Sequence, residues 1–233
     1  MGGENGAVER ARRRALRAGR KLAFKLRTRG RSRHGLVGLP YLAQMQRRFQ
    51  FRFLTSQGLR AEHRLLDIGC GTLRGGIPLI EYLQTGNYIG IEARPKVLEE
   101  GRRELLEAGL EHKQPLLIAT ADPSEVTLEA PLDFAWAFMV LIHMPDEVVQ
   151  SYLGFVARAM TEDGALFANV MVGEQAPKEW VGFPVISRPL SLYERWAHEQ
   201  GLAVESLGTL ASLGHHGGVD GDDTVMLRFT RSA

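Results

Sequence analysis

The residues from Leu65 to Gly76 (LLDIGCGTLRGG) combine a short apolar run, one acid and closely spaced glycines. An apolar run that breaks into glycines predicts a buried strand that turns sharply into a helix. Because glycine has no Cβ, Gly69 and Gly71 can adopt positive φ and let backbone N–H groups approach a ligand. The helix that follows adds its unpaired N-terminal N–H groups. The stretch is therefore predicted to be a nucleotide-binding turn.

The spacing within this turn separates it from two common phosphate-binding motifs. A dinucleotide-binding turn needs Gly-x-Gly-x-x-Gly, but Arg74 occupies the third glycine position, and the Gly-Lys-Ser/Thr ending of a P-loop is missing. The pattern Asp67-x-Gly69-x-Gly71 instead resembles the first motif of the class I S-adenosylmethionine-dependent methyltransferases, many of which have a further glycine where this chain has Leu73. The resemblance implies S-adenosyl-L-methionine as the cofactor and S-adenosyl-L-homocysteine as the product. It places Asp67, Gly69, Cys70, Gly71 and Arg74 at the cofactor.

A second candidate binding residue, Glu92, ends the strand predicted over Tyr88–Glu92. It lies 23 residues after Gly69, close to the offset of about 20 residues at which an acid binds ribose hydroxyls in nucleoside-binding folds. An acid at a strand end could also cap the next helix. The paired spacing favours ribose binding by Glu92, with Ala93 beside it.

Later strand ends supply the remaining candidates. By the resemblance, Asp122 after the third strand contacts adenine, although an Asp before Pro is also an ordinary turn residue. Phe138 ends the fourth strand, predicted over Leu132–Phe138, and Met139 follows it; in the resembling family this strand end lies beneath the cofactor sulfonium. His143 follows them and is the candidate catalytic base, because histidine titrates near neutral pH. The alternative is a histidine that only orients the strand end.

The order of elements predicts an α/β fold. Strands and helices alternate from residue 65 onward, and the chain ends in a helix and a close pair of strands. Such alternation indicates a mainly parallel sheet between two layers of helices. We therefore expect a three-layer Rossmann-like sandwich with a mostly parallel seven-stranded sheet and an antiparallel last strand. Glycine and proline between His34 and Pro40 divide the chain into an arm, residues 1–40, and a methyltransferase domain, residues 41–233.

The arm is strongly basic. Residues 1–34 carry a net charge of +10, which leaves −8 for the rest of a chain whose total is +2. A loosely amphipathic helix over Val8–Leu26 that is simply solvated, and binding of nucleic acid or another anionic surface through residues 10–33, both remain open. A targeting peptide is disfavoured because no apolar core follows the charges. No apolar run approaches the ~20 residues of a transmembrane helix, so we expect a cytoplasmic protein.

The single cysteine, Cys70, excludes an internal disulfide and any multi-cysteine metal cluster. A packing role is favoured for it over a catalytic thiol, since no histidine is near in sequence. Histidine and aspartate residues that could bind a divalent metal ion gather before the last strand: His215, His216, Asp220, Asp222 and Asp223. The glycines among them favour a mobile, solvated turn instead, so we predict no metal site.

The acceptor is the least determined feature. The Asn/Asp-Pro-Pro-Tyr/Phe motif of amino-methylating nucleic-acid enzymes and the Pro-Cys nucleophile of cytosine C5 methyltransferases are both missing. A small-molecule, glycan or natural-product acceptor, methylated on oxygen or nitrogen, is therefore favoured. A methyltransferase for RNA or another polyanion, or a non-catalytic binding protein, are the alternatives. The segment from Gly173 to Trp196 could build the acceptor pocket with Trp180, Phe183, Tyr193 and Trp196, although these residues could equally belong to the core. A helix predicted over Tyr41–Leu59, before the glycine turn, offers Tyr41, Gln50 and Arg52 as further substrate or cofactor contacts, although it could equally be a surface helix.

Overall fold

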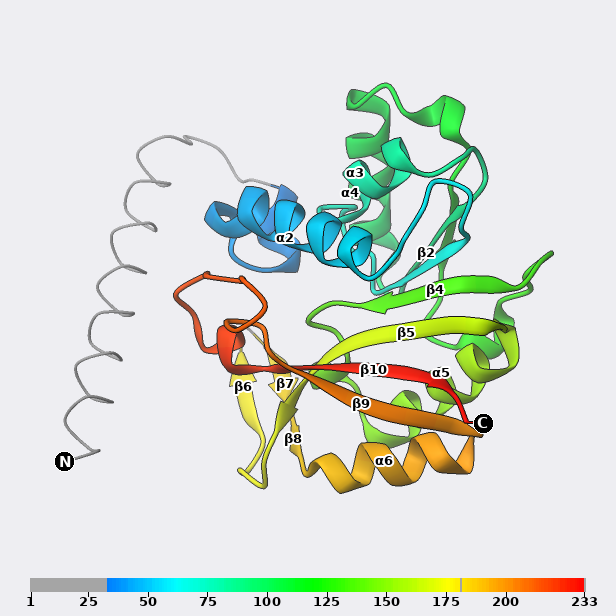
Figure 1. Cartoon of the computed structure of the whole chain (residues 1–233). Coiled ribbons are helices and arrows are strands. Elements are labelled where there is room, and N and C mark those ends of the chain that lie inside the picture. Colours follow the sequence, from blue (N-terminus) through cyan, green and yellow to red (C-terminus); the bar gives the residue numbers. More distant parts are fainter. Residues whose placement is uncertain (1–32, 181, 233) are drawn as a thin grey trace.

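A computed structural model of the chain describes residues 33–180 and 182–232. One central sheet crosses this part of the molecule, and helices cover both of its faces (Figure 1). The predicted three-layer sandwich is confirmed. The first 32 residues of the basic arm, including the helix predicted over Val8–Leu26, lie outside the described residues, so these predictions stay predictions.

The sheet follows the strand order β3-β2-β1-β4-β5-β10-β9, and short β8 pairs with β5 as an eighth strand. Neighbours from β3 to β5 are parallel, whereas β10 is antiparallel to both β5 and β9. The seven-stranded path with an antiparallel last strand is therefore confirmed. The strands are β1 (Leu65–Ile68), β2 (Tyr88–Glu92), β3 (Leu116–Ala119), β4 (Leu132–Ala137), β5 (Met160–Val172), β8 (Ser187–Arg188), β9 (Leu202–Thr209) and β10 (Val225–Arg231).

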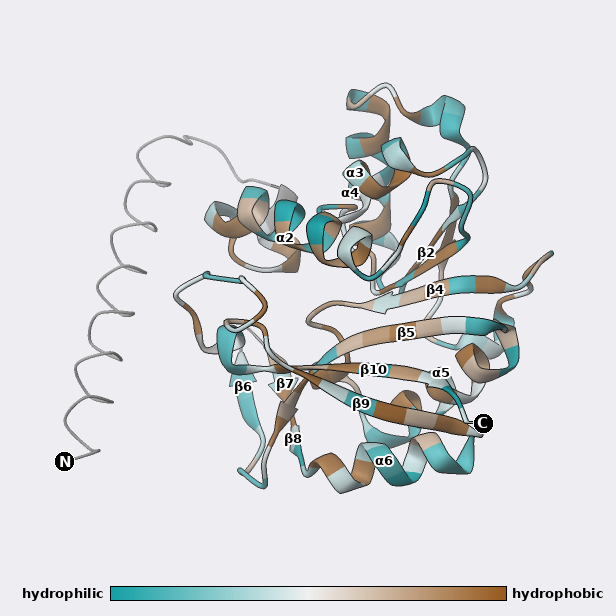
Figure 2. Ribbon diagram, in the orientation of Figure 1, coloured by the Kyte–Doolittle hydropathy of each residue, from teal (hydrophilic) through white to brown (hydrophobic). Residues whose placement is uncertain are grey.

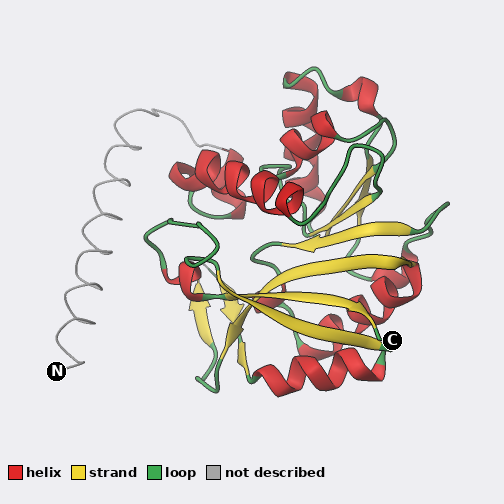
Figure 3. Cartoon of the chain, viewed as in Figure 1, coloured by secondary structure: helices red, strands yellow, loops and turns green. Residues whose placement is uncertain are grey.

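Successive side chains of the central strands enter two separate cores. Leu65 and Trp136 pack on one face with helices α2 (Ala43–Ser56), α3 (Gly76–Tyr82) and α4 (Pro95–Glu107). Leu66 and Ala135 pack on the other face with α5 (Asp146–Ala159) and α6 (Leu190–Glu199). Because both faces are covered, the parallel strands are buried and read as apolar runs. Figure 3 shows the two helix layers on either side of the sheet.

The local sequence explains where helices α4 and α5 begin. Helix α4 has Pro95 at its first position, and α5 follows Pro145 with Asp146 and Glu147 in its first turn, which complements the helix dipole. In α6, hydrophobic and hydrophilic residues alternate around the helix (Figure 2), as expected when one face packs on the sheet. The short 3₁₀ helices are η1 (Arg33–Val37), η2 (Pro40–Leu42), η3 (Glu111–Lys113), η4 (Pro123–Glu125), η5 (Leu141–His143) and η6 (Asp220–Asp223).

Two features were not predicted. A small antiparallel hairpin, β6 (Lys178–Trp180) with β7 (Phe183–Val185), occupies the segment between β5 and α6. In addition, the folded part begins before residue 41, because η1 and η2 precede α2 and Arg94 Nη1 donates a hydrogen bond to Leu36 O at 3.1 Å. Residues 33–40 therefore contact the rest of the described chain, while the division into an arm over residues 1–40 and a domain over residues 41–233 stays a prediction.

The turn after β1 contains an unusual leucine. Leu73, at the position where a glycine is common in the resembling family, has φ of 54° and is fully buried. A left-handed backbone is unfavourable for a residue with a Cβ by roughly 1–2 kcal/mol. The buried side chain offsets this strain: a Cβ at Gly76 or at Gly101 would lie 3.2 or 3.1 Å from Leu73 side-chain atoms, so both glycines leave room for it.

We expect Leu73→Gly to be at least as stable as Leu73→Ala, although glycine is smaller. Both variants lose the buried side chain, worth about 2–5 kcal/mol, but only glycine relieves the backbone strain. Urea unfolding measures the free energies of unfolding. The control is Leu79, which is also fully buried but lies within α3, where glycine should be about 1 kcal/mol worse than alanine. If Leu73 showed the same ranking as Leu79, the strain would be absent.

Candidate active site

A cavity of about 400 Å³ lies at the carboxyl ends of β1, β2 and β4, where the strand order reverses. The glycine turn forms its floor, with φ of 69° at Gly69 and 60° at Gly71. A Cβ at Gly69 would lie 2.5 Å from Val140 Cγ2, and one at Gly71 would lie 2.9 Å from Val37 Cγ1. Glycine is therefore needed at both positions for conformation and for space.

Asp67 is a buried acid at the edge of this cavity. Tyr88 Oη donates a hydrogen bond to Asp67 Oδ2 at 2.5 Å. Burial, together with the charge of Glu92, raises the pKa of Asp67 to about 7, although the Tyr88 hydrogen bond opposes the shift. The carboxyl group is thus poised near neutral pH, and a positively charged ligand would favour its ionised form.

Glu92, the second acid, is also buried and has one fixed and one available oxygen. Its Oε1 accepts hydrogen bonds from Arg94 N at 3.1 Å and Arg94 Nε at 2.9 Å. Its Oε2 accepts none from the described part of the chain. Arg94 also lies over the Phe183 ring, 5.1 Å from the ring centroid, and so links β2 to the hairpin. The arrangement holds Glu92 with one oxygen left for a ligand.

Met139, at the end of β4, has a left-handed backbone with φ of 56°. Its N–H donates to Asn169 Oδ1 at 2.7 Å, and the fully buried Asn169 side chain is held in turn by Thr224 Oγ1 at 2.9 Å. A strained backbone persists only where surrounding contacts hold it in place, and such strain is common at functional sites. Asn169 thus fixes the backbone on which Met139 enters the cavity.

His143 lines the same cavity and is partly buried. Its Nδ1 lies 2.6 Å from Pro184 O, and because a carbonyl only accepts, Nδ1 carries the proton and Nε2 keeps its lone pair. Burial lowers the pKa of His143; the hydrogen bond to Pro184 opposes this shift and the charge of Arg94 adds to it. The imidazole is therefore neutral at pH 7 and can accept a proton.

The structure brings nearly all the predicted site residues together. All of them line the cavity except Asp122, which is exposed and accepts a hydrogen bond from Ser124 N at 2.8 Å; its neighbour Ala121 lines the cavity instead. Burial raises the pKa of the Cys70 thiol, which keeps it protonated and suits packing better than nucleophilic chemistry. Residues of the predicted set on the cavity wall are Asp67, Gly69, Cys70, Gly71, Arg74, Glu92, Ala93, Phe138, Met139 and His143.

The aromatic candidates divide into two groups. Trp180 and Phe183, from the hairpin, line the cavity, and the His143 ring stacks on Trp180 with centroids 6.2 Å apart. Tyr193 and Trp196, from α6, are core residues. Of the earlier helix, Gln50 reaches the cavity and accepts a hydrogen bond from Trp136 Nε1 at 2.9 Å. Tyr41 and Arg52 are not among the lining residues.

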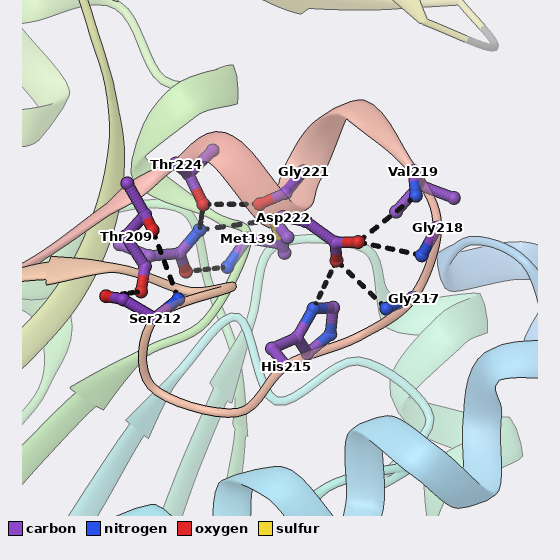
Figure 4. A network of polar contacts seen from close by, with 11 residues as sticks. Met139, Thr209, Ser212, His215, Gly217, Gly218, Val219, Gly221, Asp222 and Thr224 are labelled. Atoms are coloured by element: carbon purple, nitrogen blue, oxygen red, sulfur yellow. Dashed lines mark hydrogen bonds and ion pairs between the residues drawn. The ribbon is translucent and has the colours of Figure 1, made fainter. Parts of the chain in front are cut away.

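The loop before β10 is not the solvated turn that its glycines suggest. His215 and Asp222 are buried, with His215 Nδ1 2.6 Å from Asp222 Oδ1 (Figure 4). Asp222 also accepts hydrogen bonds from Gly217 N, Gly218 N and Val219 N. Burial alone would raise the pKa of Asp222, but these hydrogen bonds and the His215 charge leave it below its ordinary value. Among the described residues, His, Cys, Asp and Glu form no group of three or more able to hold a metal ion.

The comparison with protein families decides what kind of domain this cavity belongs to. Residues 66–166, from β1 into β5, match the family described as a methyltransferase domain. Over these residues the chain is similar to a methyltransferase domain. Among curated protein sequences, none matches this chain.

Solved structures agree with the methyltransferase fold. Magnesium protoporphyrin IX methyltransferase from Synechocystis, solved with S-adenosylmethionine bound, superposes with a TM-score of 0.61 at 15% identity, covering 88% of this chain and 87% of that one. The glycopeptide N-methyltransferase MtfA gives 0.61 at 15% identity, with 80% and 90% covered. The YcgJ protein from Bacillus subtilis gives 0.58 at 17% identity, with 80% and 99% covered. The fold is that of the Rossmann-like methyltransferases.

Several residues of the candidate site were missed by sequence reasoning. Arg94 holds Glu92, and its place two residues after that acid was an available signal. Leu36 and Val37 line the cavity but fall in the segment assigned to the arm. Asn169 contacts Met139 from 30 residues away, and no pattern in the neighbouring sequence indicates this contact.

None of the described helices is long and apolar enough to cross a membrane.

We expect Asp222→Ala to lower the free energy of unfolding by about 3–5 kcal/mol, because it removes the acceptor that Asp222 provides to the buried His215 and to three backbone N–H groups. The native pKa of Asp222 lies below its ordinary value of 3.8. The ionised carboxylate therefore stabilises the fold above pH 3.8, and this stabilisation is lost as the pH falls through the native pKa. Urea unfolding at several pH values measures the difference, which should shrink in acid. The control, Glu205→Ala, removes an exposed acid 3.7 Å from Arg228 and should change stability by less than about 1 kcal/mol. Equal effects of the two substitutions would contradict the role of the buried pair.

Proposed function

We propose that this protein transfers the methyl group of S-adenosylmethionine to oxygen or nitrogen of a small-molecule, glycan or natural-product acceptor. The observation that carries the proposal is the convergence of the glycine turn, Glu92 and His143 on one cavity in a methyltransferase domain. Neighbouring structures named as porphyrin and glycopeptide methyltransferases support this class of acceptor. The single cysteine, which leaves no internal disulfide, is compatible with the cytoplasm that we propose as the location.

The cavity fits an adenosyl ligand in its donor and acceptor groups. Glu92 has a free carboxylate oxygen for ribose hydroxyls, and Gly69 and Gly71 line the cavity without side chains of their own. Asp67, with its raised pKa, suits a group that carries positive charge. When bound, the cofactor supplies a methyl carbon on a positively charged sulfur; as the acceptor bonds to that carbon, the carbon–sulfur bond breaks and its electron pair stays on sulfur.

The chain itself must then align the acceptor, exclude water and take a proton. Alignment alone contributes up to about 7–11 kcal/mol in favourable intramolecular systems. Apolar side chains line the cavity and would exclude water around a bound acceptor, among them Val37, Phe138, Val140 and Trp180. His143 Nε2 accepts the proton that a hydroxyl or amine loses, while the Nδ1–H bond to Pro184 O keeps the ring oriented.

Cofactor binding is tested first by calorimetry with S-adenosylhomocysteine. We expect Glu92→Gln to weaken binding at least about tenfold, because a hydrogen bond to a charged group contributes about 1.5–3 kcal/mol. Glu99→Gln, on the exposed side of α4, is the charge-matched control and should bind normally. Transfer of labelled methyl groups from S-adenosylmethionine into fractionated extract then tests catalysis.

The three open functions give different results in these two measurements. Label in small-molecule fractions supports the proposal, whereas label in nucleic acid that depends on residues 10–33 would support a polyanion methyltransferase. Binding of S-adenosylhomocysteine without any labelled product would indicate a non-catalytic binding protein. Lack of binding by the intact chain would contradict all three.

The role of His143 is tested by the pH dependence of transfer. Because only the neutral imidazole accepts a proton and its pKa is lowered, kcat/KM should rise with pH and level off with a midpoint below 6.5. In His143→Gln this acid limb should vanish and transfer should fall by about 10²–10⁴-fold, while S-adenosylhomocysteine binding changes little. Wild-type turnover in the variant would show that His143 only orients the end of β4.

A further inference from the structure

A second cavity, of about 240 Å³, adjoins the cofactor cavity and shares one wall with it. Val37, Arg74, Met139, His143 and Trp180 line both. Most of the remaining wall is apolar and comes from the segment before α2, η5, the end of β5, the hairpin and the loop before β10. These apolar residues include Leu39, Leu42, Ile142, Met171 and Val185. The second cavity is therefore a place for the body of an acceptor next to His143.

Arg74 puts a buried positive charge on the shared wall. Its side chain is only 9% exposed, and its Nη1 atom is buried without any hydrogen-bond partner. No carboxylate in the described part of the chain forms an ion pair with it. Burial, and then the charge of Arg47, lower its pKa to about 10, so it still carries its charge at neutral pH. A buried charge without a counter-ion is unfavourable, which points to an anion supplied from outside.

The unpaired Nη1 lies near Gly38. A Cβ at Gly38 would lie 3.2 Å from Arg74 Nη1, and Gly38 lines the second cavity but not the first. Gln46, on α2, also lines only the second cavity. Its side chain is 6% exposed, and its Oε1 atom is buried without a partner. Two independent orphaned groups, one cationic and one a neutral amide, therefore border the same space.

The remaining charges at this cavity do not oppose an anion. Lys178 and Glu179 lie at its rim on β6, and both are exposed. Their charges offset each other and are screened by water, whereas the charge of Arg74 is buried and acts at close range. A guanidinium presents a planar fork of N–H donors that matches a carboxylate.

We propose that the acceptor of this methyltransferase is a small, mainly apolar carboxylic acid. Arg74 binds its carboxylate, the Gln46 amide binds a second polar group, and the apolar walls hold its body. The carboxylate is the anchor, so the methylated atom is a separate hydroxyl or amine that reaches His143. This assignment rests on the proposed function and adds the class of acceptor. The other source of a carboxylate at Arg74 is the methionine part of the cofactor itself.

The test uses full-length protein saturated with S-adenosylhomocysteine and two pairs of probes, benzoate with benzamide and 4-hydroxybenzoate with 4-hydroxybenzamide. Each pair has nearly the same shape and differs in charge. We expect the carboxylates to bind at least about tenfold more tightly than the amides, as measured by calorimetry or ligand-observed NMR. Arg74→Met should abolish this preference, and Arg74→Lys, which keeps the charge, should retain part of it. Lys178→Met removes an exposed charge from the same cavity and should leave the preference intact.

Three results would overturn the assignment. One is equal binding of carboxylate and amide by the wild-type protein, and another is no binding of any carboxylate at millimolar concentration. The third is a tenfold loss of S-adenosylhomocysteine affinity in Arg74→Met with unchanged affinity for methylthioadenosine, which lacks the amino-acid part; Arg74 would then serve the cofactor. Circular dichroism confirms that each variant is folded. Failure of the proposed function is distinguishable, because the wild-type protein would then not bind S-adenosylhomocysteine at all.

Discussion

The structure depends on the left-handed backbone of the turn between β1 and α3. Gly69, Gly71 and Leu73 all have positive φ, which brings the chain around within a few residues and leaves a surface without side chains. Other elements pack directly onto that bare surface: Val140 lies against Gly69 and Val37 lies against Gly71. The glycines thus do more than admit a ligand. They let the end of β4 and the segment before α2 approach close enough to wall the cavity.

Much of this arrangement could be predicted, because it follows from short-range rules. A strand buried on both faces appears as an apolar run, and a parallel sheet places the residues at its strand ends along one edge. The strand Tyr88–Glu92 was therefore predicted with its observed bounds, and Glu92 and His143 were predicted to meet although 51 residues separate them. Asp122 shows where this reasoning ends. A position after a strand places a residue near the edge but does not decide whether its side chain turns toward the cavity or caps η4.

What could not be predicted depends on partners distant in sequence. The glycines around His215 indicate a solvated turn by composition, yet one buried ion pair and three backbone hydrogen bonds on Asp222 organise the loop. Likewise, neither Asn169 nor Met139 reveals by itself that the amide of one holds the strained backbone of the other. The hairpin β6–β7 escaped prediction because its strands are only three residues long and partly exposed, so neither periodicity nor burial marks them.

The buried polar groups divide the site by charge. On the side proposed for the cofactor, Asp67 and Glu92 lie close enough for the charge of Glu92 to raise the pKa of Asp67, so this half favours a ligand with positive charge. On the other side, Arg74 has no counter-ion, so that half favours an anion. If the cofactor binds as proposed, loss of its methyl group would leave sulfur neutral and reduce its attraction to the two acids, so the acids would hold the product less tightly. His143, which lines both cavities, would take up the acceptor proton from its neutral state and so add no second positive charge before the transfer.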